Sequence, residues 1–172
     1  EMKQNCLVLT APSKTFNLAG LQTSNIFVPN EALRRKLEEF LKRGSANPKC
    51  NILGYKACEI AYSSCGEWLD ECIQVIDENR RVITEFMAEN FPQIRVCELQ
   101  ATYLLWMDWN GLGLDYKELE RINRQEAGLF FDEGYIFGAQ GEGFERWNLA
   151  CPTSYVVAAL KRMKEAYGKY VK

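Results

Sequence analysis

The spacing of apolar residues changes at Phe91-Pro92, and this change limits the folds that the sequence can adopt. Before this point, apolar side chains recur every three or four residues, which places them on one face of a helix. The stretches with this spacing are 31–43, 51–64 and 66–90. After this point, the sequence has short apolar runs typical of strands. These runs are 94–97, 103–108, 129–131 and 144–150.

Two further helices complete the predicted order of elements. Asp115 can cap a helix that runs to about residue 124, and a terminal helix begins near residue 153. Asp132 and Glu133 are interpreted as turn residues. The resulting order is helices, two strands, a helix, two strands and a helix. This order predicts an α+β domain, an α/β sandwich in which the helices pack against one sheet.

The amino-terminal part of the chain contains two more apolar runs, Cys6–Thr10 and Ile26–Val28, which we interpret as short strands. Pro29 interrupts this pattern, and Asn30 follows it at the start of the helix predicted over 31–43. Asparagine is favoured at this position because its side chain accepts a hydrogen bond from the first turn. We therefore expect a domain boundary near Pro29.

Length and charge limit the classes of partner. A chain of 172 residues can bury one sizeable core. The net charge of −2, without a basic cluster, does not predict a nucleic-acid partner. No apolar run approaches the length of a membrane span, and no charged and then apolar leader is present, so we expect no membrane partner. A cytoplasmic protein fits these features best.

The residue types that are missing limit the chemistry. The sequence has no histidine, which excludes Ser–His and Cys–His nucleophile pairs, histidine bases and the commonest zinc ligand. The seven cysteines are an odd number without a Cys-x-x-Cys pair, which argues against both a zinc knuckle and a disulfide framework. Any catalysis must therefore use lysine, carboxylates, tyrosine, arginine or a cofactor.

Lys14 follows the predicted strand Cys6–Thr10, between small residues and an apolar stretch. The carboxyl end of a strand is where open α/β sheets bind their ligands. Apolar surroundings would disfavour the ammonium form and lower the pKa of the amine. Only a neutral amine attacks a carbonyl, so the position permits imine chemistry. Local composition leaves the commoner alternative open, a solvated surface lysine.

Four segments carry a resemblance to a known family. The run APSKTFNLAGLQ, residues 11–22, resembles the cofactor-lysine segment of fold-type I enzymes that use pyridoxal phosphate. It is most similar to the cystathionine β-lyase-like (C–S lyase) branch of aminotransferase class I/II. The other segments follow in the same order: Ala61-Tyr62 with Gly66–Leu69, Asn79–Arg81, and Gly141–Ala150. The resemblance extends from Leu7 to the last helix.

This resemblance implies roles for three residues. Lys14 would be the catalytic lysine that covalently holds pyridoxal 5'-phosphate, and Ser13 would contact the cofactor's phosphate. Arg146, in GEGFERWNLA, would bind the substrate's α-carboxylate, which a planar guanidinium grips at two points. Without the resemblance, Arg146 would be interpreted as a surface residue. Gln22 stands where many aminotransferases have a phosphate-binding arginine, so the phosphate contacts stay open.

The resemblance also implies an organisation. Residues 1–29 would end the large cofactor-binding domain, and residues 30–172 would form the connecting helix and the carboxyl-terminal small domain. Family members form homodimers, and the loop 47–54 resembles a segment at the subunit boundary. Most of the family's cofactor pocket lies upstream of the cofactor lysine. We therefore expect a carboxyl-terminal fragment of a longer protein.

The expected function is that of a pyridoxal-phosphate-dependent enzyme acting on amino acids, either an aminotransferase or a C–S β-lyase that cleaves cystathionine or cysteine. Both outcomes would use the same residues of this chain. The local matches favour the lyase branch. The alternative is a non-catalytic folding or dimerisation module, because the cofactor pocket is incomplete in this chain and the fragment alone is expected to be inactive.

Overall fold

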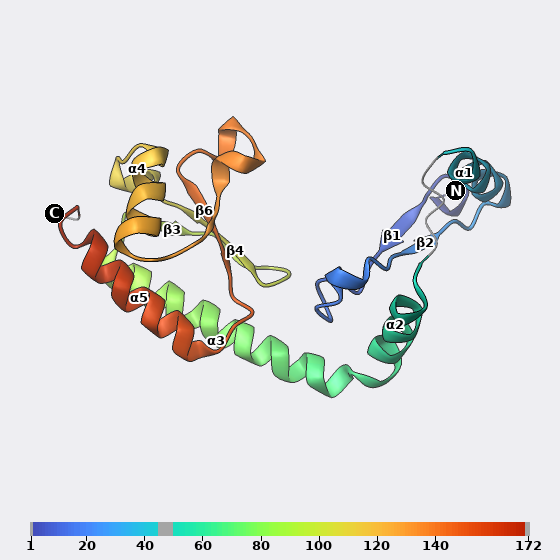
Figure 1. The fold of residues 1–172 in the computed structure, drawn as a ribbon, viewed down its shortest axis with the longest axis horizontal. Helices are drawn as coiled ribbons and strands as arrows, with labels where there is room; N and C mark the ends of the chain where they lie inside the picture. The colour runs from blue at the N-terminus through green and yellow to red at the C-terminus, as the bar shows by residue number, and fades with distance from the viewer. Residues whose placement is uncertain (1, 45–49, 171–172) are drawn as a thin grey trace. The chain divides into compact units, whose positions relative to one another are not determined.

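The computed structural model describes residues 2–44 and 50–170 (Figure 1). The chain divides into two compact units, Glu1–Leu69 and Asp70–Lys172. The division falls within the helix α3 (Gly66–Asn90). The domain boundary expected near Pro29 stays a prediction. Part of the loop 47–54 that resembles a subunit boundary lies outside the described residues.

The first unit contains a two-stranded antiparallel ribbon and two helices. Strand β1 (Val8–Thr10) pairs with β2 (Asn25–Phe27), which confirms both strands expected in this part of the chain. Helix α1 (Glu31–Arg43) begins where Asn30 Oδ1 accepts a hydrogen bond from the Leu33 N–H at 3.1 Å. Helix α2 (Ile52–Ser64) follows. The expected cap of α1 is thus confirmed.

The first unit encloses little core of its own. The buried residues within 3–44 and 50–69 are Pro12, Thr23, Val28, Gly54 and Ala61. Large apolar side chains are instead exposed on every element, including Leu9 on β1, Phe40 on α1 and Ile52 on α2. Burial of apolar surface is the main favourable term in folding. Contacts within this unit therefore leave much apolar surface open to water.

The second unit is built on a four-stranded antiparallel sheet with the order β3-β4-β6-β5. Its central ladder pairs β4 (Leu104–Asp108) with β6 (Phe144–Asn148) in a continuous register from Leu104↔Asn148 to Asp108↔Phe144. The outer strands are β3 (Arg95–Val96) and β5 (Asp132–Glu133). Helices α3 and α5 (Thr153–Tyr167) lie side by side in Figure 1. This arrangement confirms the expected α+β class.

Alternation along the central strands produces the core. Successive side chains of a strand point to opposite faces, so Leu105, Met107 and Trp147 share one face of the sheet. They form one apolar cluster with residues of α3 and α5, which include Ile83, Met87, Leu160 and Met163. The fully buried Asn79 of α3 donates from Nδ2 to the carbonyl oxygens of Leu149 (2.9 Å) and Cys151 (2.8 Å). This contact ties α3 to the connection between β6 and α5.

Two expectations for this unit need correction. The helix capped by Asp115 is α4 (Tyr116–Arg121), and the chain then continues as a π-helical turn over Ile122–Glu126. The strand expected at 129–131 was wrong, because the sheet hydrogen bonds form three residues later, in β5. Leu129 and Phe131 are buried as core residues outside a strand. Asp132 and Glu133 are therefore strand residues and not turn residues.

Glu145 lies on the core-facing side of β6 and is almost completely buried. Its Oε1 accepts a hydrogen bond from Asn123 Nδ2 at 3.2 Å, and its Oε2 is buried without a hydrogen-bond partner among the described residues. Burial raises the pKa of Glu145 to about 8, with a further contribution from the charge of Glu133, while Asn123 acts in the opposite direction. The carboxyl group is therefore mostly protonated at neutral pH.

All seven cysteines are free thiols. In the parts of the chain that the structure describes, no helix combines the length and apolar character needed to cross a bilayer. Within the same residues, histidine, cysteine and acidic side chains form no group of three that could hold a metal ion.

A prediction for the first unit concerns Gly54, at the start of α2. A Cβ atom at this position would lie 2.1 Å from Thr23 Oγ1, which is buried and bonded to the Leu21 carbonyl. Gly54→Ala should therefore lower the free energy of unfolding by about 1–3 kcal/mol. Gly66→Ala is the matched control, because no atom lies within 4 Å of its Cβ position. Thermal unfolding followed by circular dichroism measures both, and equal melting temperatures for the two variants would contradict the prediction.

A second prediction concerns the pH dependence of stability. The unfolded chain ionises Glu145 near pH 4.3, whereas the folded chain binds this proton up to about pH 8. The protonated Glu145 therefore contributes fully to the free energy of unfolding below the pKa of the unfolded chain. This contribution is lost as the pH rises through the pKa of the folded chain, about 8. Glu145→Gln should remove this slope, so that the variant gains several kcal/mol relative to the wild type between pH 5 and pH 9. Urea unfolding at a series of pH values across this range measures the free energy of unfolding of both proteins. The exposed Glu142→Gln is the control, and parallel curves for wild type and Glu145→Gln would refute the assignment.

Candidate functional site

Lys14 lies in the turn that follows β1, where the sequence placed it. The Phe16 N–H donates to the Pro12 carbonyl at 2.9 Å and closes this turn around the lysine. Asn17, just beyond, has a φ of +54°, a left-handed conformation that asparagine tolerates better than most residues. The backbone at Lys14 is thus held by a local hydrogen bond and a sharp change of direction.

Aromatic side chains anchor the turn from outside. The Phe16 ring contacts Tyr62 of α2 edge-on, with ring centroids 5.2 Å apart, and stacks near Trp68 of α3 at 6.4 Å. Such aromatic pairs add about 0.5–1.5 kcal/mol beyond the area they bury. Tyr62 and Trp68 belong to the segments that carry the family resemblance. Their contact with Phe16 is a physical reason for residues of these types at these positions.

The other end of the loop is fixed to the start of α2. The Leu21 carbonyl accepts hydrogen bonds from Asn51 Nδ2 at 2.8 Å and from Thr23 Oγ1 at 3.2 Å. Asn51 also caps α2, because its Oδ1 accepts from the Gly54 N–H at 2.7 Å. One asparagine therefore positions both the helix and the loop that carries the lysine.

The Lys14 side chain is exposed, and Ser13 beside it is partly buried. The sequence predicted an apolar enclosure around the lysine, and the described residues of this unit do not form one. A primary amine and a neighbouring hydroxyl are nevertheless the groups that fit an aldehyde cofactor with a phosphate, since the amine attacks the carbonyl carbon and the hydroxyl can donate to the phosphate. The chemistry of these two side chains is compatible with pyridoxal phosphate.

Arg146 lies in the middle of β6, on the face of the sheet opposite to Glu145. Its Nε and Nη2 both donate to Asp132 Oδ2, at 3.0 and 2.7 Å. The guanidinium carbon lies 4.6 Å from the centroid of the Phe137 ring, a cation–π contact. The Arg146 side chain is 29% exposed, so it is reachable from solvent.

Three aromatic rings lie on the same face of the sheet as Arg146, and we call them the aromatic platform: Trp106, Phe137 and Phe144. Trp106 is the cross-strand partner of Arg146 on β4. Its ring stacks on Phe144, with centroids 5.5 Å apart, and meets the Phe137 ring edge-on at 5.8 Å. Charge and aromatic surface are thus combined on one face of the sheet, a composition suited to a small ligand with a carboxylate.

Lys14 lies in the first unit and Arg146 in the second, and each is described within its own unit. Asp132 and Phe137 are neighbours of Arg146 that the sequence alone does not indicate. No local pattern would have found them, because Asp132 meets Arg146 only through the pairing of β5 with β6.

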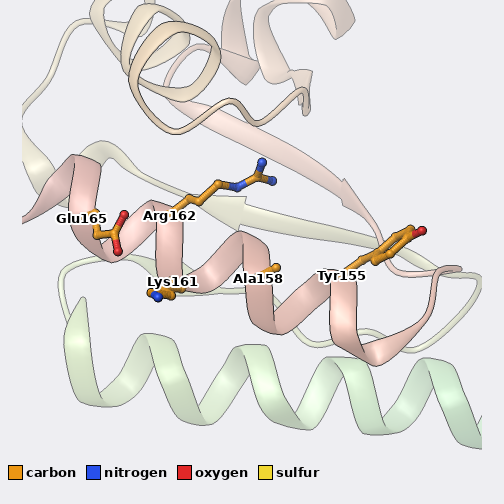
Figure 2. Close-up of a pocket in the computed structure, with 5 residues that line it drawn as sticks. All are labelled: Tyr155, Ala158, Lys161, Arg162 and Glu165. Carbon is orange, nitrogen blue, oxygen red and sulfur yellow. The ribbon is translucent and has the colours of Figure 1, made fainter.

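A depression on α5 is a separate feature. Figure 2 shows the side chains that line it, all from one helix. They are Tyr155, Ala158, Lys161, Arg162 and Glu165. All are exposed, and neither Lys14 nor Arg146 is among them. We therefore treat the lysine turn and the Arg146 face as two candidate sites, each within its own unit.

Comparison with known proteins identifies a family. Residues 1–163 match the family described as aminotransferase class I and II. Among curated proteins, the chain is 36% identical to the cystathionine beta-lyase PatB of Bacillus subtilis over 156 residues, which cover 91% of this chain and 40% of PatB.

Solved structures give the same result. Cystalysin from Treponema denticola, which contains a pyridoxal 5'-phosphate cofactor, is 43% identical with a TM-score of 0.91, over 97% of this chain and 42% of cystalysin. A pyridoxal-phosphate-bound putative aminotransferase from Clostridium difficile 630 is 36% identical with a TM-score of 0.88, over 95% of this chain and 42% of that protein.

The chain therefore spans about two-fifths of the length of these relatives. The family match covers nearly all of its residues and includes both the lysine turn and the Arg146 strand. The chain belongs to the aminotransferase class I and II family of pyridoxal-phosphate-dependent enzymes.

Proposed function

We propose that this chain is the carboxyl-terminal part of a pyridoxal-phosphate-dependent C–S β-lyase that acts on cystathionine or cysteine. The observation that carries the proposal is the anchored Lys14 turn, in a chain 36% identical to a protein named cystathionine beta-lyase. Transamination is the second candidate, because a similar solved structure is named a putative aminotransferase.

Each proposed residue has one role. Lys14 Nζ attaches the cofactor covalently and, when released by the substrate amine, takes the proton from the substrate's α-carbon. Ser13 donates a hydrogen bond to the cofactor phosphate. Arg146 binds the substrate α-carboxylate and so orients the bond to be broken. When bound, the cofactor supplies an electron sink for the negative charge that proton removal leaves.

The exposed apolar side chains of the first unit support the proposal that this chain is part of a longer protein. Apolar side chains on β1, β2, α1 and α2 are open to water, which is costly for a unit that stands alone. We propose that residues 1–29 complete a large cofactor-binding domain, and that residues 30–172 form the connecting helix and small domain. A homodimer would cover part of this surface. A cytoplasmic location is proposed on the composition alone.

The first test is an activity assay on the full-length protein that contains this chain. With cystathionine we expect pyruvate and a free thiol. Lys14→Ala should lower the rate by about 10²-fold or more, because it removes the proposed proton carrier. Lys42→Ala, an exposed lysine of α1, is the matched control. Amino transfer to a keto acid without release of thiol would reject the lyase and leave the aminotransferase.

The second test uses the 172-residue chain alone, with pyridoxal phosphate added. We expect little or no visible absorption band from lysine-bound cofactor, because Lys14 is exposed and the chain spans about two-fifths of its relatives. This result would agree with the alternative, a non-catalytic folding or dimerisation module, for the isolated chain. A strong band that disappears in Lys14→Ala would instead exclude the alternative.

A further inference from the structure

The contact between Arg146 and Asp132 leaves one edge of the guanidinium open. A guanidinium has two edges that can grip a carboxylate, one formed by Nε and Nη2 and the other by Nη1 and Nη2. Asp132 Oδ2 accepts from Nε and Nη2 and so takes the first edge. Among the described residues, none accepts a hydrogen bond from Nη1.

Arg81 of α3 differs in this respect, whereas Arg80, which bonds Asp77 through Nε alone, also leaves its Nη1/Nη2 edge open among the described residues. Arg81 donates from Nε and Nη2 to Glu78 and from Nη1 to Glu85, so all three of its nitrogens are engaged. The nitrogens of such an arginine all donate to carboxylates of its own helix, so the guanidinium offers no open edge to a ligand. Arg146 has an open edge together with a two-nitrogen contact to Asp132 and a contact with the Phe137 ring, and this combination leaves the group fixed and able to bind a second carboxylate.

The backbone fixes this arrangement. Asp132 and Arg146 are directly opposed in the ladder between β5 and β6, a placement that brings side chains on one face together. The guanidinium carbon of Arg146 lies 4.6 Å from the centroid of the Phe137 ring. The contacts with Asp132 and with Phe137 together restrict the direction in which the guanidinium points.

We propose that Asp132 is a positioning residue, which holds the Nε edge of Arg146 so that the Nη1/Nη2 edge meets the α-carboxylate of an amino-acid substrate. This inference rests on the proposed function. Asp132 and the substrate occupy different edges, so they bind the same guanidinium together. Pre-orientation lowers the entropy lost when the substrate binds, which outweighs the repulsion between the two carboxylates.

The test measures competitive inhibition of the full-length enzyme by L-alanine and by ethylamine, which lacks the carboxylate. Asp132→Ala should weaken L-alanine binding about tenfold, the size expected for lost hydrogen bonds to a charged group, and leave ethylamine binding unchanged. Asp132→Asn retains an acceptor oxygen and should restore binding to near the wild-type value. A merely structural role would affect both inhibitors equally.

Asp77→Ala is the matched control, because Asp77 makes a similar ion pair with Arg80 on α3. Circular dichroism and thermal unfolding verify that each variant folds. Tighter binding of L-alanine by Asp132→Ala would show competition and overturn the inference, as would equal losses for both inhibitors. The variant Arg146→Ala distinguishes a failure of this inference from a failure of the proposed function. If Arg146→Ala abolishes the preference for L-alanine and Asp132→Ala has no effect, only the inference fails. If Arg146→Ala leaves the preference intact, the proposed role of Arg146 fails as well.

Discussion

The antiparallel ladder between β4 and β6 is the interaction on which the second unit depends. Its register runs without a break from Leu104↔Asn148 to Asp108↔Phe144. Because side chains alternate between faces, one face of this ladder packs into the apolar core. The other face carries Arg146 beside the aromatic platform. A slip of one residue would exchange the two sets. The core that stabilises the unit therefore also enforces the position of the candidate substrate-binding residue.

Adjacent residues of β6 illustrate how strongly this alternation determines chemistry. Glu145 is buried between the sheet and the helices, and its carboxyl group stays protonated to about pH 8. Arg146, the next residue, faces solvent with its charge balanced by Asp132. The same two residue types on one face would form an ordinary ion pair. On opposite faces, one becomes a neutral core residue and the other remains available to a ligand.

In the first unit, local contacts and not a large core hold the candidate residue. The turn at Lys14 is held by its own hydrogen bond, by the Phe16 cluster and by Asn51, so its backbone position does not depend on a large core. Its apolar surface and its lysine are both exposed. The chain spans about two-fifths of the length of its relatives, which fits our proposal that residues 1–29 complete a large cofactor-binding domain.

The sequence by itself determined the helices, the caps Asn30 and Asp115, and most strands, because hydrophobic period and capping side chains act over a few residues. It also identified Lys14, Ser13 and Arg146 as candidates through a resemblance, although their roles are still proposals. Only the tertiary structure decided that the strand expected at 129–131 forms at Asp132–Glu133, that Glu145 is buried, and that Asp132 pairs with Arg146. These features depend on pairing between segments distant in sequence, and local composition does not determine which strands pair.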